Sequence, residues 1–219
     1  MATPYYQDDY VTLYHGDCLE LTDWLEADVL VTDPPYGVDY TNGWVAGRVR
    51  STTAIAADKT PEARNSVVEM WGNKPYIMFG SWRVPKPRNV RQTLIWSKAG
   101  DPGLGDLTMP WGSSYEEIYV SGAGEIWGGP RIGSVLTFDK PRGNDRPDHP
   151  TPKPIPLMEH LIGRSPGGVI ADPFAGSGAT LMAARNLGRR AVGVELEEKY
   201  CEIIARRLSQ GAFDFEVTS

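Results

Sequence analysis

Short apolar runs alternate with segments of helical spacing along this chain of 219 residues. Apolar residues at every second position, or in a short unbroken run, predict strands, whereas spacing of three to four residues predicts helices. Strands are predicted at residues 11–14, 27–32, 76–79, 93–97, 117–120, 135–138, 169–171 and 191–194. Helices are predicted at 18–26, with Leu19, Leu21, Trp24 and Leu25 facing inward, at 61–71, 154–164 and 177–187, and around Tyr200, Ile204 and Leu208.

The last third of the chain indicates the fold class. A glycine-bearing turn follows the strand at 169–171 and leads into the helix at 177–187, which Gly188 ends. Another strand and helix follow, and such βαβα units form parallel sheets covered by helices. The nearly continuous apolar run at 27–32 is typical of a strand buried on both faces of such a sheet. We therefore expect an α/β fold with a doubly wound, mostly parallel sheet.

Composition narrows the protein class. A hydrophobic content of 41% and a charged content of 23% are ordinary, and the length fits a single domain. The sequence has no apolar stretch long enough to span a membrane and no secretory signal, so we expect a cytoplasmic protein that does not bind membranes. Cys18 and Cys201 fit reduced, packed thiols, and two cysteines are too few for a zinc site, so we expect no metal.

The charge of the chain gives mixed indications about nucleic acid. A net charge of −6 argues mildly against it, because phosphate contacts need Lys and Arg. A local basic cluster matters more than the total charge. Basic residues gather in the middle of the chain at Arg83, Lys86, Arg88, Arg91, Lys98, Arg131, Lys140, Arg142 and Arg146. Each of them alone also fits an ordinary solvated face.

The segment Asp172–Gly178 has the character of a cofactor loop. It follows a strand and opens a helix, and glycines at 176 and 178 allow a ligand to approach the backbone closely. Glu195 ends the next strand, where a carboxylate can bind two ribose hydroxyls. The spacing differs from the dinucleotide pattern G-x-G-x-x-G, and an acidic Asp172 suits a cationic amino-acid moiety better than a pyrophosphate. An ordinary glycine-rich turn is the alternative.

The tetrapeptide Asp33-Pro34-Pro35-Tyr36 follows the buried strand at 27–32, at the end of the strand where open α/β sheets bind ligands. The amino group of a base has two hydrogens, which the Asp33 carboxylate and the Pro34 carbonyl can accept, while Tyr36 offers a flat face for stacking. A rigid turn that caps a core strand is the alternative. The tetrapeptide arises by chance in a chain of this length with a probability on the order of 10⁻³.

With both motifs present, the chain resembles the DNA amino-methyltransferases, the adenine-N6 and cytosine-N4 enzymes. Because the tetrapeptide precedes the cofactor loop, the order matches their circularly permuted class, with a Rossmann-like fold that binds S-adenosylmethionine. The resemblance makes Asp33, Pro34, Pro35 and Tyr36 catalytic, and an initial aspartate is more usual in adenine enzymes. It assigns cofactor binding to Asp17, Thr151, Lys153, Asp172, Phe174, Ala175, Gly176, Ser177, Gly178 and Glu195. Residues 96–98 and 115–118 resemble the family's later strands.

The resemblance also implies an activity and a domain plan. We expect one methyltransferase domain over residues 1–219, with a mobile target loop at 37–60 and a short target-recognition region at 121–148. The expected reaction moves a methyl group to the N6 amine of adenine in double-stranded DNA, by base flipping and direct displacement. The short recognition region leaves a role for a second subunit in a homodimer, and the size suits a bacterial or phage-encoded enzyme.

Four alternatives remain open from the sequence. Cytosine-N4 methylation is the nearest, followed by methylation of RNA or of a protein amide. A non-catalytic DNA-binding module with the same fold would bind DNA without consuming cofactor. A nicotinamide oxidoreductase is the most remote, because the loop lacks the dinucleotide spacing.

Overall fold

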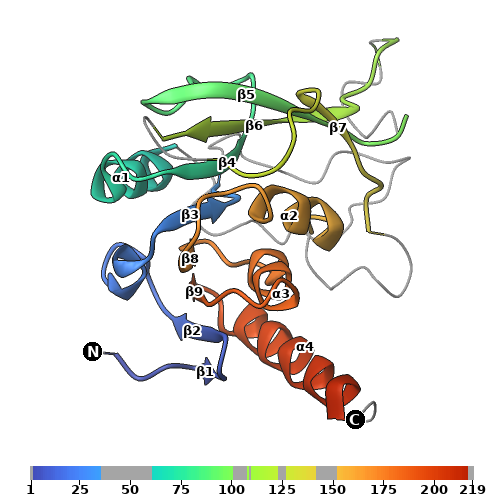
Figure 1. The fold of residues 1–219 in the computed structure, drawn as a ribbon. Helices are drawn as coiled ribbons and strands as arrows, with labels where there is room; N and C mark the ends of the chain where they lie inside the picture. The colour runs from blue at the N-terminus through green and yellow to red at the C-terminus, as the bar shows by residue number, and fades with distance from the viewer. Residues whose placement is uncertain are drawn as a thin grey trace.

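A computed structural model of the chain describes residues 2–35, 61–100, 108, 110–122, 127–141 and 152–216. In this part of the chain a single mixed sheet of nine strands runs through the molecule (Figure 1). The strands are β1 (Tyr6–Gln7), β2 (Val11–His15), β3 (Val29–Thr32), β4 (Tyr76–Gly80), β5 (Val90–Ser97), β6 (Tyr115–Ser121), β7 (Val135–Thr137), β8 (Ile170–Asp172) and β9 (Ala191–Glu195). The helices are η1 (Asp23–Glu26), α1 (Glu62–Trp71), α2 (Ile155–Ile162), α3 (Ala179–Asn186) and α4 (Glu198–Glu216).

The strand order β1-β2-β9-β8-β3-β4-β6-β5-β7 places the two motifs side by side. The five strands from β2 to β4 in this order are mutually parallel, whereas β6 runs antiparallel to β4 and β5. From β3 the chain continues to β4 on one side, and from β8 it continues to β9 on the other. Strands β3 and β8 therefore flank a topological switch point, where open α/β sheets bind ligands. The predicted α/β fold with a mostly parallel sheet is confirmed.

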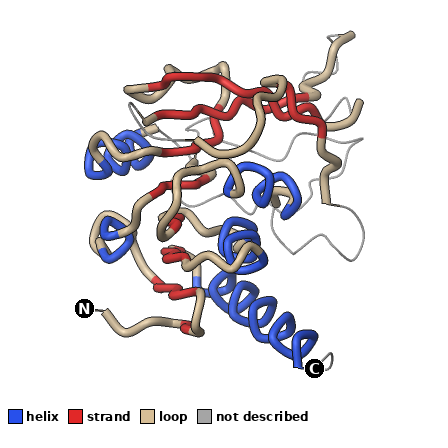
Figure 2. The backbone as a smooth tube through the Cα atoms, viewed as in Figure 1, coloured by secondary structure: helices blue, strands red, loops and turns tan. Residues whose placement is uncertain are grey.

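Helices cover both faces of the sheet, as Figures 1 and 2 show. On one face, Val29 and Val31 of β3 share a buried cluster with residues of α2, α3 and α4, among them Leu181 and Ile204. On the other face, Leu30 packs with residues of η1 and α1. Successive residues of β3 thus enter opposite cores, as a strand buried on both faces requires.

The first turn of the molecule differs from the prediction. Residues 18–26 do not form one helix, because only Asp23–Glu26 are helical, as a 3₁₀ turn. The carbonyl of Cys18 accepts the indole N–H of Trp24 at 2.9 Å, and the Asp17 carboxylate accepts the Leu19 N–H at 2.8 Å. These side-chain bonds replace the helical ladder, and Leu19 is exposed rather than inward.

Other predicted elements lie within a few residues of the observed ones. Strand β1 was not predicted, because a strand of two residues is too short to show an alternating pattern. Leu187, directly after α3, is exposed. Cys18 and Cys201 are buried free thiols, as expected. Among the described helices, none has both the length and the apolarity that crossing a membrane requires. The predicted loop at 37–60, Tyr36, Thr151 and much of 121–148 lie outside the described residues.

Candidate active site

Four acidic residues stand along one edge of the sheet, at the carboxyl ends of four neighbouring parallel strands. Asp17 follows β2, Glu195 ends β9, Asp172 ends β8 and Asp33 follows β3. The register aligns them, since His15 pairs with Glu195 and Asp172 pairs with Gly193. Residues that span the sequence from position 17 to 195 therefore meet at the switch point, and the predicted cofactor and amine motifs share one site.

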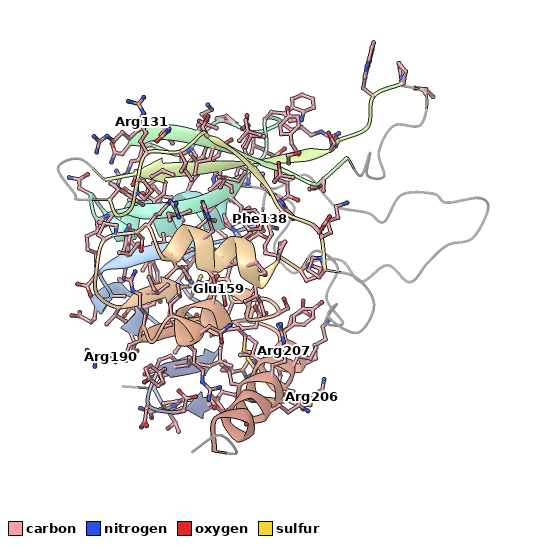
Figure 3. All side chains as sticks on the ribbon, turned by 45° about the vertical axis from the view of Figure 1, so that its right-hand side comes forward. Arg131, Phe138, Glu159, Arg190, Arg206 and Arg207 are labelled. Carbon is pink, nitrogen blue, oxygen red and sulfur yellow. The ribbon has the colours of Figure 1, made fainter. Side chains whose placement is uncertain are left out.

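The loop from Asp172 to Gly178 folds back onto β9. The Ala175 N–H donates to the Val194 carbonyl at 3.0 Å, and the Gly178 N–H donates to the Ala175 carbonyl at 2.7 Å. Gly178 has a φ of 81°, and a Cβ there would lie 2.9 Å from Ile204 Cγ1 of α4. Only glycine adopts this conformation easily and leaves this space. Arg207 of α4, labelled in Figure 3, donates to the Ser177 carbonyl and holds the loop from behind.

Glu195 is fixed by backbone donors. Its Oε2 accepts the Gly176 N–H at 2.7 Å, and its Oε1 accepts the Glu197 N–H at 2.9 Å. Burial raises the pKa of this carboxyl group, and the two backbone bonds act in the opposite direction. The acid is thus already oriented by the loop itself, as the prediction of a ribose-binding carboxylate requires.

Asp172 joins the two motifs. Its buried carboxylate accepts the Thr32 hydroxyl at 2.7 Å and the Phe174 N–H at 3.2 Å. The pKa of Asp172 is raised to about 7, mainly by burial. The hydrogen-bond donors around the carboxylate act in the opposite direction, and the neighbouring charge of Asp33 adds to the rise. The hydrogen bond from Thr32 connects the strand that carries the tetrapeptide to the strand that carries the cofactor loop.

The Asp33 carboxylate forms an ion pair with the ammonium of Lys153. The Asp33 side chain keeps 23% of its exposure, whereas the Lys153 side chain keeps 6%. Lys153 Nζ also lies 3.3 Å from Glu116 Oε2, and Lys98 Nζ lies 2.7 Å from Glu116 Oε1. Burial lowers the pKa of Lys153, but Asp33 and Glu116 outweigh it, so that the pKa lies above its ordinary value.

The structure places most of the predicted site residues at this edge. Asp33, Asp172 and Glu195 converge there, Asp17 is exposed beside them, and Lys153 joins Asp33. The segment after Asp172 presents its backbone at the edge, while the side chains of Ala175 and Ser177 are buried and Phe174 packs partly against the core. Pro34 is buried and Pro35 is half-buried; Tyr36 and Thr151 lie outside the described residues.

Sequence reasoning missed Glu116 and Lys98 as site residues. Glu116 had appeared only within a segment that resembles a family strand, and Lys98 only in such a segment and in the cluster of basic residues. One signal was present: a charged residue stands at position 116, opposite the buried Trp96 and two residues before the buried Ile118. A carboxylate at such a position needs a partner of opposite charge.

Comparison with known proteins identifies the family. A family model described as DNA methylase, of the N6 and N4 methyltransferases, matches residues 57–206, more than half of the chain. This chain belongs to that DNA amino-methyltransferase family. The chain is 42% identical to the type II methyltransferase M2.LlaDCHI of Lactococcus lactis subsp. cremoris, over 97% of this chain and 94% of that protein. It is 27% identical to M.ScaI of Streptomyces caespitosus, over 97% and 86%.

Solved structures share the fold. The M1.HpyAVI complex with S-adenosylmethionine superposes with a TM-score of 0.65 and 23% identity, over 90% of this chain and 99% of that one. The cytosine-N4-specific PvuII DNA methyltransferase superposes with a TM-score of 0.64 and 15% identity, over 92% and 87%. The predicted Rossmann-like methyltransferase fold is confirmed.

Members of this family use S-adenosylmethionine, and the site fits it. The cofactor carries a cationic amino-acid end and a ribose with two hydroxyls, and the edge provides carboxylates for both at Asp172 and Glu195. The loop exposes backbone rather than bulky side chains, so that a ligand can lie close to it. Asp17 follows β2, two strands from Asp172, at the same edge.

Proposed function

We propose that this DNA methyltransferase methylates the N6 amine of adenine in double-stranded DNA. The observation that carries the proposal is the position of Asp33: its carboxylate lies beside the cofactor edge and is held by Lys153. An aspartate at the start of the tetrapeptide favours adenine. The fold does not distinguish the two bases, because the cytosine-N4-specific PvuII enzyme shares it.

The mechanism follows from the acceptors at the amine site. Asp33 accepts one amine hydrogen and the Pro34 carbonyl the other, which draws electron density toward the nitrogen. The bound cofactor supplies an electrophilic methyl group on a sulfonium centre. Asp33 receives the proton that the nitrogen loses as it gains a carbon, and passes it to solvent. Neither cysteine acts as a nucleophile, since burial raises the pKa of both thiols to about 12.

Exposed aromatic side chains on the same edge support a DNA contact. Trp82, two residues beyond β4, is 64% exposed, and Trp111, which precedes β6, is 80% exposed. Strand β6 runs antiparallel to β4, with Gly80 opposite Glu117, so the start of β6 and the end of β4 share the edge that holds Asp33. Such rings stack on bases, and each stacking contact contributes about 1–3 kcal/mol. We infer that Trp82 and Trp111 contact the DNA strand on either side of a flipped base.

The predicted basic cluster contributes less to this surface than its sequence suggested. Arg88 donates to the carbonyls of Val68 and Glu69, Arg91 donates to the Gly122 carbonyl, and Lys98 pairs with Glu116. Arg83 remains beside Trp82, with its guanidinium 5.4 Å from the ring centroid. Target recognition by residues 37–60 and 121–148, a homodimer and the circularly permuted class remain predictions.

One experiment tests the proposal directly. The protein is incubated with unmethylated duplex DNA and S-adenosylmethionine, and the DNA is digested to nucleosides for mass spectrometry. We expect N6-methyladenine. N4-methylcytosine would keep the site and the mechanism but contradict the base assignment. Neither product, from protein that binds the cofactor, would favour an RNA substrate or a non-catalytic DNA-binding module.

A further inference from the structure

Glu116 lies inside the amine site, yet the reaction described above gives it no role. The side chain keeps 21% of its exposure, but Oε2 is closed to solvent. Among the described residues this oxygen has no hydrogen-bond donor, and its charge partner is the ammonium of Lys153 at 3.3 Å. The other oxygen lies 2.7 Å from the ammonium of Lys98. Four charges thus alternate in sign from Lys98 through Glu116 and Lys153 to Asp33.

The alternating charges offset the repulsion between the carboxylates of Asp33 and Asp172. The charge of Asp33 lies close enough to raise the pKa of Asp172, so the two carboxylates repel each other when both are ionised. A protonated Asp33 would be a poorer acceptor for the base amine. The ammonium of Lys153 offsets this repulsion, because it pairs with Asp33 directly.

Lys153 needs support in turn. A lysine with a buried side chain tends to lose its proton, since burial disfavours the charged form. Asp33 and Glu116 together outweigh this effect for Lys153. Burial also acts on Glu116, and there Lys153 and Lys98 outweigh it, so that the pKa of Glu116 lies below its ordinary value. The neighbouring opposite charges thus favour the charged forms of Lys153 and Glu116.

We propose that Glu116, with Lys98 behind it, is a positioning residue of the methyl-transfer site: it holds the Lys153 ammonium against Asp33, which fixes the rotation of the Asp33 carboxylate toward the base amine. The inference rests on the proposed methyl transfer. It assigns Lys153 to the amine site, whereas the family resemblance implied that Lys153 binds the cofactor.

The test compares Glu116→Gln with Glu117→Gln, the next residue on β6. Glu117 points to the opposite face, where it accepts the Tyr119 hydroxyl. We expect E116Q to lower kcat on DNA on the order of tenfold to a hundredfold, the scale of a small misplacement of a catalytic group. The KM for S-adenosylmethionine should change little, so that the loss falls on kcat, as expected of a positioning residue in the amine site. E117Q should keep the wild-type kcat.

A second comparison separates positioning from mere stabilisation. E116Q leaves one uncompensated positive charge, and the double variant Lys98→Met/Glu116→Gln restores neutrality. We expect the double variant to regain thermal stability while kcat stays as low as in E116Q. Calorimetric titration with S-adenosylmethionine should give wild-type affinity for E116Q and for the double variant.

The outcomes against the inference are distinct. A wild-type kcat in E116Q would overturn it, and so would a kcat that recovers together with thermal stability in the double variant. If E116Q does not fold, Lys98→Met alone makes the same test, with a smaller fall in kcat and an unchanged KM for S-adenosylmethionine. A wild-type protein that methylates no DNA contradicts the proposed function itself, a result that does not depend on the variants.

Discussion

The two halves of the active-site edge are built in different ways. The cofactor half is made by segments that are short in sequence, Asp172–Gly178 and the end of β9, and held by backbone N–H groups that donate to Asp172 and Glu195. The amine half is made by side chains at positions 33, 98, 116 and 153, held by charge. A backbone-built site is fixed once its loop forms, whereas a charge-built site depends on each partner keeping its ionisation state. Substitutions in the two halves should therefore have different effects on kcat, on cofactor affinity and on stability.

The largest effect should come from Asp33→Ala. Removing the acceptor should lower kcat by at least about a thousandfold, within the range for a catalytic acid or base. The affinity for S-adenosylmethionine should remain near wild type in calorimetric titration, because the backbone-built half is intact. Asp9→Ala, an exposed aspartate in the turn before β2, serves as the control. Loss of both activity and cofactor affinity would mean that the halves are not separable.

Gly178→Ala should damage the cofactor half alone. The new Cβ meets Ile204 Cγ1 at 2.9 Å, in addition to the strain of a positive φ. Gly188→Ala is the matched control, because its φ is 66° but nothing lies within 4 Å of the added carbon. Both variants carry the strain of about 1–2 kcal/mol, so the extra loss of thermal stability in G178A measures the clash. Cofactor affinity should fall in G178A only; equal behaviour of the two variants would contradict the close packing of the loop on α4.

Trp82→Ala should weaken DNA binding without touching either half. Loss of one stacking contact of about 1–3 kcal/mol corresponds to roughly five- to a hundredfold in Kd. Fluorescence anisotropy with labelled duplex measures it, and cofactor affinity should not change. Tyr10→Ala is the control, since Tyr10 is an exposed aromatic residue at the opposite edge, before β2. Unchanged DNA affinity in W82A would move the DNA surface away from β4.

The smallest effect concerns pH and stability. The pKa of Asp172 is raised to about 7, so the folded state disfavours its ionised form, and the stability present below the unfolded pKa is lost as pH rises through 7. Asp172→Asn removes this dependence while its oxygen can still accept the bonds from Thr32 and Phe174. We expect D172N to have a higher melting temperature than wild type at pH 8 and a similar one near pH 4, with cofactor binding lost. A wild-type advantage at pH 8 would show that Asp172 is stabilised as an anion.

What could be predicted from the sequence follows the same division. The cofactor loop and Glu195 were identified because strand, turn, helix and next strand are contiguous, so local pattern fixes their geometry. Asp33 was found through its tetrapeptide. The ion pairs of Glu116 with Lys98 and Lys153 could not be found in this way, because β5, which Lys98 follows, and β6, which carries Glu116, are antiparallel strands whose pairing no local pattern encodes. Trp82 and Trp111 were missed for a related reason, since their exposure depends on where the sheet ends.

The hydrogen bond between Thr32 and Asp172 spans 140 positions of the chain. Closing so long a segment has an entropic cost that grows with its length, and β3 and β8 repay it only once both strands are present. Neither the segment that contains β3 nor the segment that contains β8 can form the reaction site by itself. A ribosome that stops before position 172 therefore releases a product that lacks Asp172 and the cofactor loop, and this product has no reaction centre.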